Sequence, residues 1–341
     1  MKPELTYQGS VKNVYKIGHE NLFEFSDRYS VFDWGEMPDH LEKKGEALAL
    51  MGALFFDVMS KNGIDHHFIA LTDKDGHETK AFAPTNFMKV KNIPVVRPLE
   101  IGNGKYGYDF YKTRPTEGLV PLEVMFRFGI SKGSSLLKRA QQDPALLKQW
   151  NLGPLHEGIR FEKPIIDFST KLEKGDRYLT HSEAQELAGL TSDEFKKLIE
   201  LNTKVAIILA DLFKEINLEL WDGKTEWAYT SCKSGERNFM LVDTIGLDEL
   251  RLETKGQFLS KEFLRQYYKK SDWYLELEKT KAHEANFRQN MVSAPEHLPE
   301  SIKFKAESLY MSFTNELAQF LKGSKPFANE HALNKWLELK S

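Results

Sequence analysis

Short apolar runs separated by turn residues fill the first hundred positions, a pattern that favours strands. Gly18 and His19 interrupt one such run, so the residues on either side are expected to pair as a hairpin. Further along, apolar residues take up helical spacing, and Asn62 with Gly63 marks the end of that helix. Residues 1–97 are therefore expected to form a small antiparallel lobe with one helix. The expected strands are residues 5–16, 20–26, 66–71, 79–83 and 87–91, and the expected helix is residues 46–61.

Residues 98–118 are rich in glycine, tyrosine and proline and show no hydrophobic period, which indicates a linker or an insertion. A second lobe, residues 119–270, is expected to begin with an apolar strand near Val120. Its clearest pattern is an apolar helical face that follows Thr191 and Glu194, whose types and spacing match a capping box. The expected elements are a helix at residues 192–216 and strands at 226–231 and 237–242, with a turn at Ser234 and Gly235.

After Arg251 the apolar residues keep helical spacing to the end of the chain. Residues 271–341 are expected to form a helical extension that packs on the second lobe or makes a contact in a homo-oligomer. The sequence leaves both arrangements open. Strands followed by helices indicate an α+β fold. The expected helices of this part are residues 260–269, 272–290 and 299–321.

Composition narrows the class of protein. With 341 residues, 41% of them hydrophobic, the chain can form about two domains with ordinary buried cores. Its 47 Lys and Arg against 50 Asp and Glu leave a net charge of −3, which excludes a strongly basic nucleic-acid binder. One cysteine, Cys232, allows no intrachain disulfide and favours a reducing, cytoplasmic setting. No run approaches about 18 apolar residues, so neither a membrane partner nor secretion is expected.

The opening turn, with Gly9, Ser10, Lys12 and Val14, has residues that suit phosphate binding. Glycine lets backbone N–H groups approach a phosphate closely, and lysine adds a positive charge. The same residues are typical of a plain hairpin. This turn alone therefore leaves both interpretations open.

Two acidic stretches, residues 222–226 and 243–248, would lie at one end of neighbouring strands if the segment between them is a hairpin. Mg²⁺ uses one or two carboxylates and leaves its other positions to phosphates and water. Glu226 with Asp243 suits such a site. The alternative is that these acids are solvated turn residues.

Five basic residues lie at the ends of expected elements. Arginine presents a planar fork that matches phosphate and carboxylate oxygens, as an anionic metabolite would require. Two of them, Lys261 and Arg265, are four residues apart and share one face of a helix. In a chain with many basic residues, ordinary surface charge is the alternative. The five residues are Arg127, Lys171, Arg251, Lys261 and Arg265.

Taken in order, these motifs resemble those of the SAICAR synthetase (phosphoribosylaminoimidazole-succinocarboxamide synthase) family, from about Tyr7 to Tyr267. The most specific part is Ser26-Asp27-Arg28 with Ser30, Phe32 and Asp33. The other matching positions are Gly9 to Tyr15, Lys44-Gly45, Pro121 to Arg127, Gly133-Ser134, Thr170-Lys171-Leu172-Glu173, Asp222, Lys224, Glu226, Asp243, Asp248, Arg251, Lys261 and Arg265.

The resemblance implies a two-lobed ATP-binding fold, with a small antiparallel lobe, a larger α+β lobe and nucleotide between them. It implies a cytoplasmic ligase of de novo purine biosynthesis that acts on small molecules. In that reaction carboxyaminoimidazole ribotide and L-aspartate are joined through an acyl phosphate, giving SAICAR, ADP and phosphate. The implied cofactors are ATP and Mg²⁺.

The resemblance also implies roles for single residues. Catalytic roles fall on Lys12, Lys171, Lys224 and Asp222, and nucleotide binding falls on Gly9, Ser10, Lys12, Val14, Lys91, Lys171 and Lys224. Ribotide binding falls on Arg127, Ser134, Arg251, Lys261 and Arg265, and metal binding on Glu226 and Asp243.

Several positions depart from the family pattern. Ser10 replaces a lysine, Thr244 replaces an acid, and residues 175–178 (Gly-Asp-Arg-Tyr) replace an expected His-Asp. Because the His-Asp motif belongs to the substrate region, a related carboxylate–amine ligase with another acid or amine is an alternative. A small-molecule kinase with the same cleft and a nucleotide-binding pseudoenzyme are two more.

Overall fold

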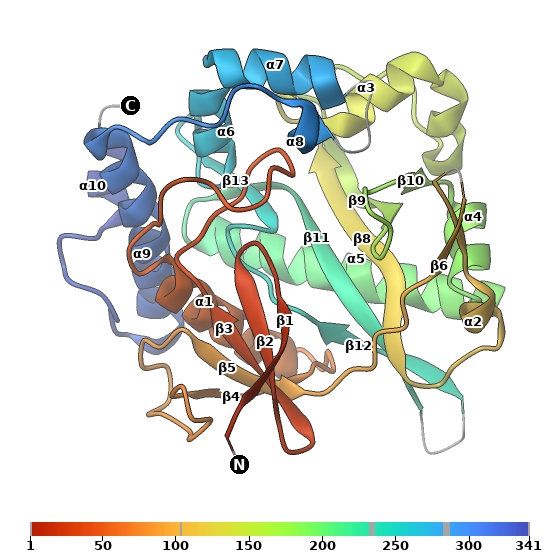
Figure 1. Ribbon diagram of the computed structural model, residues 1–341, viewed down its shortest axis with the longest axis horizontal. Coiled ribbons are helices and arrows are strands. Elements are labelled where there is room, and N and C mark those ends of the chain that lie inside the picture. Colours follow the sequence, from red (N-terminus) through yellow and green to blue (C-terminus); the bar gives the residue numbers. More distant parts are fainter. Residues whose placement is uncertain (1, 103, 232–235, 282–286, 340–341) are drawn as a thin grey trace.

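The computed structural model describes residues 2–102, 104–231, 236–281 and 287–339, which form two large antiparallel sheets flanked by helices and one small two-stranded sheet (Figure 1). The first sheet has the order β1-β2-β3-β5-β4, and helix α1 (Lys44–Lys61) packs against β3, β4 and β5. Its strands are β1 (Glu4–Gln8), β2 (Lys12–Ile17), β3 (Glu20–Phe25), β4 (Phe68–Thr72) and β5 (Phe87–Lys91).

The expected hairpin around Gly18 is confirmed as β2 and β3, and the expected first helix is confirmed as α1. Two strand predictions need correction. The strand expected at 5–16 is divided into β1 and β2 by a turn in which Gly9 N–H donates to the Lys12 carbonyl at 2.9 Å. The strand expected at 79–83 is absent from the described structure, because Phe82 has φ +57°, which is incompatible with an extended strand.

Helix α1 approaches the first sheet closely because its first turn contains glycine. A Cβ atom on Gly45 would lie 2.2 Å from the Phe25 carbonyl oxygen at the end of β3, so any side chain there would force the two elements apart. This contact explains why glycine follows Lys44, and it fixes the start of α1 against the sheet.

The second sheet has the order β10-β9-β8-β11-β13-β14, and β12 also pairs with β11. Helix α5 (Ser192–Glu215) crosses behind it (Figure 1) and packs on β8, β9 and β11. Its capping box of Thr191 and Glu194 is confirmed. The strands are β8 (Gly118–Gly129), β9 (Arg160–Thr170), β10 (Tyr178–Leu179), β11 (Glu219–Ser231), β12 (Arg237–Val242), β13 (Leu250–Thr254) and β14 (Gln257–Phe258).

The second-lobe hairpin is confirmed in part. Strands β11 and β12 pair in antiparallel fashion as expected, but β11 begins earlier, at Glu219. The expected turn at Ser234 and Gly235, and Cys232 beside it, lie outside the described residues.

Two segments differ in secondary structure from what their sequence patterns predict. Residues 98–118 include the small hairpin β6 (Leu99–Gly102) and β7 (Lys105–Gly107), and the helical turn α2 (Asp109–Lys112). After Arg251 the chain first forms β13 and β14 rather than helix, because apolar Leu250 and Leu252 alternate with polar residues in the period of a strand.

Residues 300–322 form the long helix α9 (Glu300–Lys322), which packs on α1, and α10 (Leu333–Glu338) packs on α9 (Figure 1). The extension therefore covers the helix of the first lobe as well, which sequence reasoning did not consider. Its role in an oligomer stays a prediction. The remaining helices are α3 (Ser135–Gln142), α4 (His181–Leu187), α6 (Glu262–Tyr268), α7 (Asp272–Lys281), α8 (Phe287–Asn290) and the 3₁₀ turn Pro144–Trp150.

Among the described residues, an isolated backbone pairing joins the two large sheets. Leu241 of β12 accepts a hydrogen bond from His67 N–H at 3.1 Å and donates one to the Asp65 carbonyl at 2.8 Å. The residues just before β4 therefore lie beside β12 of the second sheet. None of the described helices combines the length and the apolar surface that a membrane span needs.

Candidate functional site

Alternation along β11 divides its side chains between the two faces of the second sheet. Thr225 faces α5, where its hydroxyl donates to the Asn202 side-chain oxygen at 2.5 Å. Asp222, Lys224 and Glu226 are the alternate residues, so they lie on the opposite face. That face carries the charged groups of the candidate site.

A cavity of about 430 Å³ opens on this face, and we call it the arginine cavity. Its wall also includes Ser10 and Ser30 from the first lobe, so both lobes enclose it. It is lined by the bases Arg127, Lys224, Arg251, Lys261 and Arg265 and by the acids Asp33, Glu123, Asp176, Asp222, Asp248 and Glu249. The mixture of arginines and acids suits an anionic ligand that also carries polar groups.

A larger cavity of about 860 Å³ lies between the two sheets, and we call it the interlobe cavity. The first sheet contributes Lys12, Val14 and Phe23, and the second lobe contributes Lys171, Glu226 and Asp243. The segment from Lys91 to Val95, which leads from β5 toward the second lobe, forms a further wall. Apolar side chains next to lysines and acids suit a ligand with a flat ring and phosphates.

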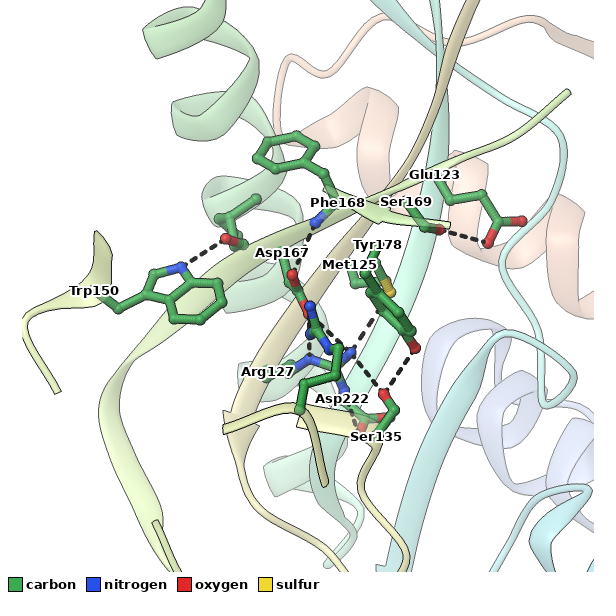
Figure 2. Close-up of polar contacts among 12 residues, drawn as sticks. Glu123, Met125, Arg127, Ser135, Trp150, Asp167, Phe168, Ser169, Tyr178 and Asp222 are labelled. Carbon is green, nitrogen blue, oxygen red and sulfur yellow. Dashed lines mark hydrogen bonds and ion pairs between the residues drawn. The ribbon is translucent and has the colours of Figure 1, made fainter. Parts of the chain in front are cut away.

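Cross-strand ion pairs hold Arg127 and Arg251 of the arginine cavity in place, and Figure 2 shows Arg127 beside Asp167 and Asp222. Arg127 of β8 donates to Asp167 of β9 at 3.1 and 3.2 Å, and its guanidinium lies 3.8 Å from Asp222 of β11. Arg251 of β13 also binds Asp222, at 2.9 Å. Burial would lower the pKa of Arg127, but the charges of Asp167 and Asp222 raise it, so the guanidinium stays charged.

A shared carboxylate connects the two cavities. Glu123 Oε1 of β8 accepts from Lys224 Nζ at 2.6 Å and from Lys171 Nζ at 3.3 Å. Lys171 Nζ also lies 2.6 Å from Glu226 Oε1. Lys224 lines the arginine cavity and Lys171 the interlobe cavity, so Glu123 stands at the boundary between them.

The electrostatics of this boundary keep both lysines protonated. Burial would lower the pKa of Lys171, but Glu226 and Glu123 raise it well above its usual value. In the same way, burial would lower the pKa of Lys224, but the charge of Glu123 raises it above its usual value. Both ammonium groups are therefore fixed positive charges rather than proton acceptors.

Asp243 connects the first lobe to the interlobe cavity through an ion pair with Lys12, whose Nζ lies 4.2 Å from the Phe23 ring centroid. Its backbone is left-handed, with φ +60°, and its carbonyl oxygen lies 2.7 Å from His67 Nε2. Burial would raise the pKa of Asp243, but Lys12 and Lys171 hold it well below its usual range. The carboxylate is therefore ionised.

Glu226 and Asp243 fit the donor set of a magnesium site. Burial and the charge of Asp243 raise the pKa of Glu226, so the two carboxylates repel each other, and a divalent cation would relieve this repulsion. The described residues contain no group of three or more His, Cys, Asp or Glu side chains that could hold a metal. A cation here would therefore depend on phosphate oxygens and water for its other ligands, as Mg²⁺ commonly does.

Most of the residues singled out from the sequence line one of the two cavities. Two of those assigned to the nucleotide line the arginine cavity rather than the interlobe cavity. Lys12, Val14, Lys91, Lys171, Glu226 and Asp243 line the interlobe cavity. Asp222, Arg127, Arg251, Lys261 and Arg265 line the arginine cavity, together with Ser10 and Lys224, which were assigned to the nucleotide.

Gly9 and Ser134 line neither cavity. Gly9 shapes the turn instead, because a Cβ atom there would lie 2.8 Å from the Lys12 carbonyl oxygen. Ser134 is the N-cap of α3, and its buried hydroxyl finds no partner in the described structure. The next residue, Ser135, lines the arginine cavity and hydrogen-bonds the Tyr178 hydroxyl at 2.7 Å.

Sequence reasoning missed several residues that line the arginine cavity. Glu123 belongs to the matching motif Pro121 to Arg127 but was given no role, although it shares strand alternation with Arg127 in the expected apolar strand. Asp176 and Tyr178 lie in the segment that departs from the family's His-Asp motif, but no site role was assigned to them, since their place follows from the path of the chain after β9. Burial and the charge of Glu123 raise the pKa of Asp176 to about 6.

Two lobes with a large cavity between them, next to a second cavity with three arginines, suit an enzyme that binds a nucleotide and an anionic small molecule. Comparison with known families agrees with this class. The family model of SAICAR synthetase matches residues 5–280, and the chain belongs to this family. Its members are ATP-dependent ligases of purine biosynthesis, a class distinct from kinases and pseudoenzymes.

Two archaeal relatives support the assignment over most of their length. A putative phosphoribosylaminoimidazole-succinocarboxamide synthase of Archaeoglobus fulgidus is 41% identical over 300 residues, covering 86% of this chain and 87% of the relative. The phosphoribosylaminoimidazole-succinocarboxamide synthase of Thermoplasma acidophilum is 31% identical over 316 residues, covering 89% and 94%.

Solved structures agree with the fold. A SAICAR synthetase in complex with ADP matches with a TM-score of 0.56 and 25% identity, covering 85% of this chain and 99% of its own. The SAICAR synthase of Saccharomyces cerevisiae, complexed with SAICAR, matches with a TM-score of 0.63 and 20% identity, covering 95% and 96%. The expected α+β fold of this family is therefore confirmed.

Proposed function

We propose that the chain joins carboxyaminoimidazole ribotide to L-aspartate, with ATP and Mg²⁺ in the interlobe cavity and the ribotide in the arginine cavity. The observation that carries this arrangement is the Glu123 carboxylate, which lies 2.6 Å from Lys224 Nζ and 3.3 Å from Lys171 Nζ. Because one lysine lines each cavity, a phosphoryl group at the boundary would lie between two fixed positive charges.

The chemistry explains why two adjoining sites are needed. A carboxylate resists attack by an amine until one of its oxygens becomes part of a good leaving group. In the first step a ribotide carboxylate oxygen attacks the γ-phosphorus of ATP, and ADP leaves. In the second, the aspartate nitrogen attacks the acyl carbon, the bond from that carbon to the phosphate oxygen breaks, and the nitrogen loses a proton.

In this reaction the side chains of the two cavities would bind the nucleotide, the metal ion and the ribotide. Lys12 and Lys171 would bind phosphates of the nucleotide, and Glu226 with Asp243 would hold Mg²⁺, which neutralises charge on phosphate oxygens when bound. Lys224 would bind the phosphoryl group from the ribotide side. The phosphate and carboxylate of the ribotide would be held by Arg127, Arg251, Lys261 and Arg265. No side chain acts as a covalent nucleophile.

An omission assay tests the proposal. Mg-ATP, carboxyaminoimidazole ribotide and L-aspartate are supplied, ADP release is followed, each component is left out in turn, and the product mass is measured. The expected result is turnover that needs all three substrates and yields the succinocarboxamide. Turnover with another acid or amine in place of either substrate, and none with the named pair, would contradict the substrate assignment.

A further inference from the structure

Helix α9 lies beyond residues 5–280, the part that the family model matches, yet one of its side chains binds a residue that lines the arginine cavity. Tyr310, in the middle of α9, is only 1% exposed. Its hydroxyl donates to Asp248 Oδ1 at 2.8 Å, and Asp248 lines that cavity. The contact joins two residues that are 62 positions apart.

The other oxygen of the same carboxylate has two basic partners. Asp248 Oδ2 lies 3.1 Å from Lys44 Nζ and 3.3 Å from Lys261 Nζ. Lys44 is fully buried, whereas Lys261 lines the arginine cavity, where it joins Arg251 and Arg265. The orientation of Asp248 therefore decides where the Lys261 ammonium group is held.

Burial makes this arrangement depend on each contact. The Asp248 side chain is 3% exposed, so water does not replace a lost donor. Burial would raise its pKa, but Lys261 and Lys44 hold the pKa well below the usual range, and the group stays charged. Lys44 Nζ also lies 5.2 Å from the Tyr310 ring centroid, so the tyrosine contacts both members of the buried ion pair.

We propose that Tyr310 is a positioning residue for the part of the arginine cavity where Lys261, Arg251 and Arg265 would bind an anion. By donating to Oδ1, it leaves Oδ2 to the two lysines, and Lys261 can direct its remaining N–H bonds to the phosphate of a ribotide. Without the hydroxyl, the buried carboxylate would turn toward its lysines and hold Lys261 away from the ligand. This inference rests on the proposed function, since it assumes that the arginine cavity binds the ribotide.

The variant Tyr310→Phe removes only the hydroxyl. We expect KM for the ribotide to rise about tenfold, in line with a lost hydrogen bond to a charged group, while KM for ATP stays within twofold. Tyr229→Phe is the matched control. Its hydroxyl is also buried and donates to the Ala188 carbonyl at 2.6 Å, but Ala188, unlike Asp248, lines neither cavity, so both KM values should stay unchanged.

A double-mutant cycle separates positioning from a general loss of structure. If Tyr310 acts through Lys261, Tyr310→Phe should change ribotide KM by less than twofold in a Lys261→Met background. Equal effects of Tyr310→Phe in both backgrounds, or equal rises of KM for ATP and ribotide, would overturn the inference.

Binding of ribose 5-phosphate, measured by isothermal titration calorimetry, tests the positioning role without relying on the proposed reaction. If the enzyme turns out to use another acid, weaker binding of ribose 5-phosphate to Tyr310→Phe than to Tyr229→Phe would still support a positioned anion site. Equal binding by the two variants would overturn the inference whatever the reaction is.

Discussion

At the scale of single residues, Asp176 shows how its surroundings set the chemistry of a carboxyl group. It lines the arginine cavity, where burial and then the charge of Glu123 raise its pKa to about 6, against the opposing charges of Lys224 and Lys171. The group is therefore mostly ionised at neutral pH and protonated in mild acid. It lies in the segment that replaces the His-Asp pair expected from the family motif, and it lines the cavity proposed for the ribotide.

We predict that Asp176 accepts the proton of the attacking amine, so kcat/KM for L-aspartate should fall about tenfold per pH unit below pH 6. The direction follows because the protonated carboxyl cannot accept a proton. Asp176→Asn should lower this constant about a hundredfold at pH 7.5 and remove the acidic limb of the pH profile. Asp109→Asn, at a largely exposed acid, is the control. An acidic limb that persists in Asp176→Asn would contradict the role.

At the scale of elements, Glu194 fastens the start of α5 to the second sheet. It accepts from Thr191 N–H at 2.8 Å and from Arg237 of β12 at 2.7 and 2.9 Å. Arg114, from the segment before β8, adds a contact at 3.0 Å. Burial would raise the pKa of Glu194, yet Arg237 and the Thr191 N–H lower it to about 2.

Because the folded-state pKa is below the ordinary 4.5, this carboxylate stabilises the protein fully above pH 4.5 and progressively less down to pH 2. We expect Glu194→Gln to lower the free energy of unfolding at pH 7 by about 3 kcal/mol. Urea denaturation at several pH values measures this, and the loss should shrink as pH falls through that window. Glu200→Gln, an exposed glutamate of α5, should change stability by less than about 0.5 kcal/mol. A loss that is the same at pH 2 and pH 7 would argue against an ionic contribution.

At the scale of the whole molecule, the interlobe cavity needs both sheets. Lys12 and Asp243 come from different lobes and form an ion pair across it, and the pairing of His67 with Leu241 joins the lobes nearby. A ligand that binds both walls should therefore stabilise the folded chain as a unit.

We predict that a non-hydrolysable ATP analogue raises Tm, and that Mg²⁺ increases this shift if Glu226 and Asp243 hold the cation as proposed. The Tm shift is measured once with Mg²⁺ and once with EDTA. In Glu226→Gln the extra shift that Mg²⁺ adds should fall by at least half, whereas the shift measured with EDTA should be mostly kept. Glu219→Gln, at the exposed start of the same strand, should behave as the unchanged protein does. A full magnesium effect in Glu226→Gln would remove Glu226 from the proposed metal site.

Some of the site could be predicted because its signals are local. The capping box of α5 spans four residues, and the motif of Asp222, Lys224 and Glu226 spans five, although the strand was expected to start only at Glu226. Such patterns act through neighbouring backbone groups, so they are readable before the chain folds. The ordered motifs added the family, and with it the two-lobed fold.

Other parts depended on contacts between distant segments. Whether Ser134 or Ser135 lines a cavity depends on how α3 packs, and Lys224 faces the arginine cavity because of the pairing of β8 with β11. Tyr310 meets Asp248 only because α9 folds back over α1. The sequence by itself therefore determined the family and most of the elements, since those follow from motif order and spacing. The tertiary structure decided which side chains share a cavity, since strand register and helix packing bring distant residues together.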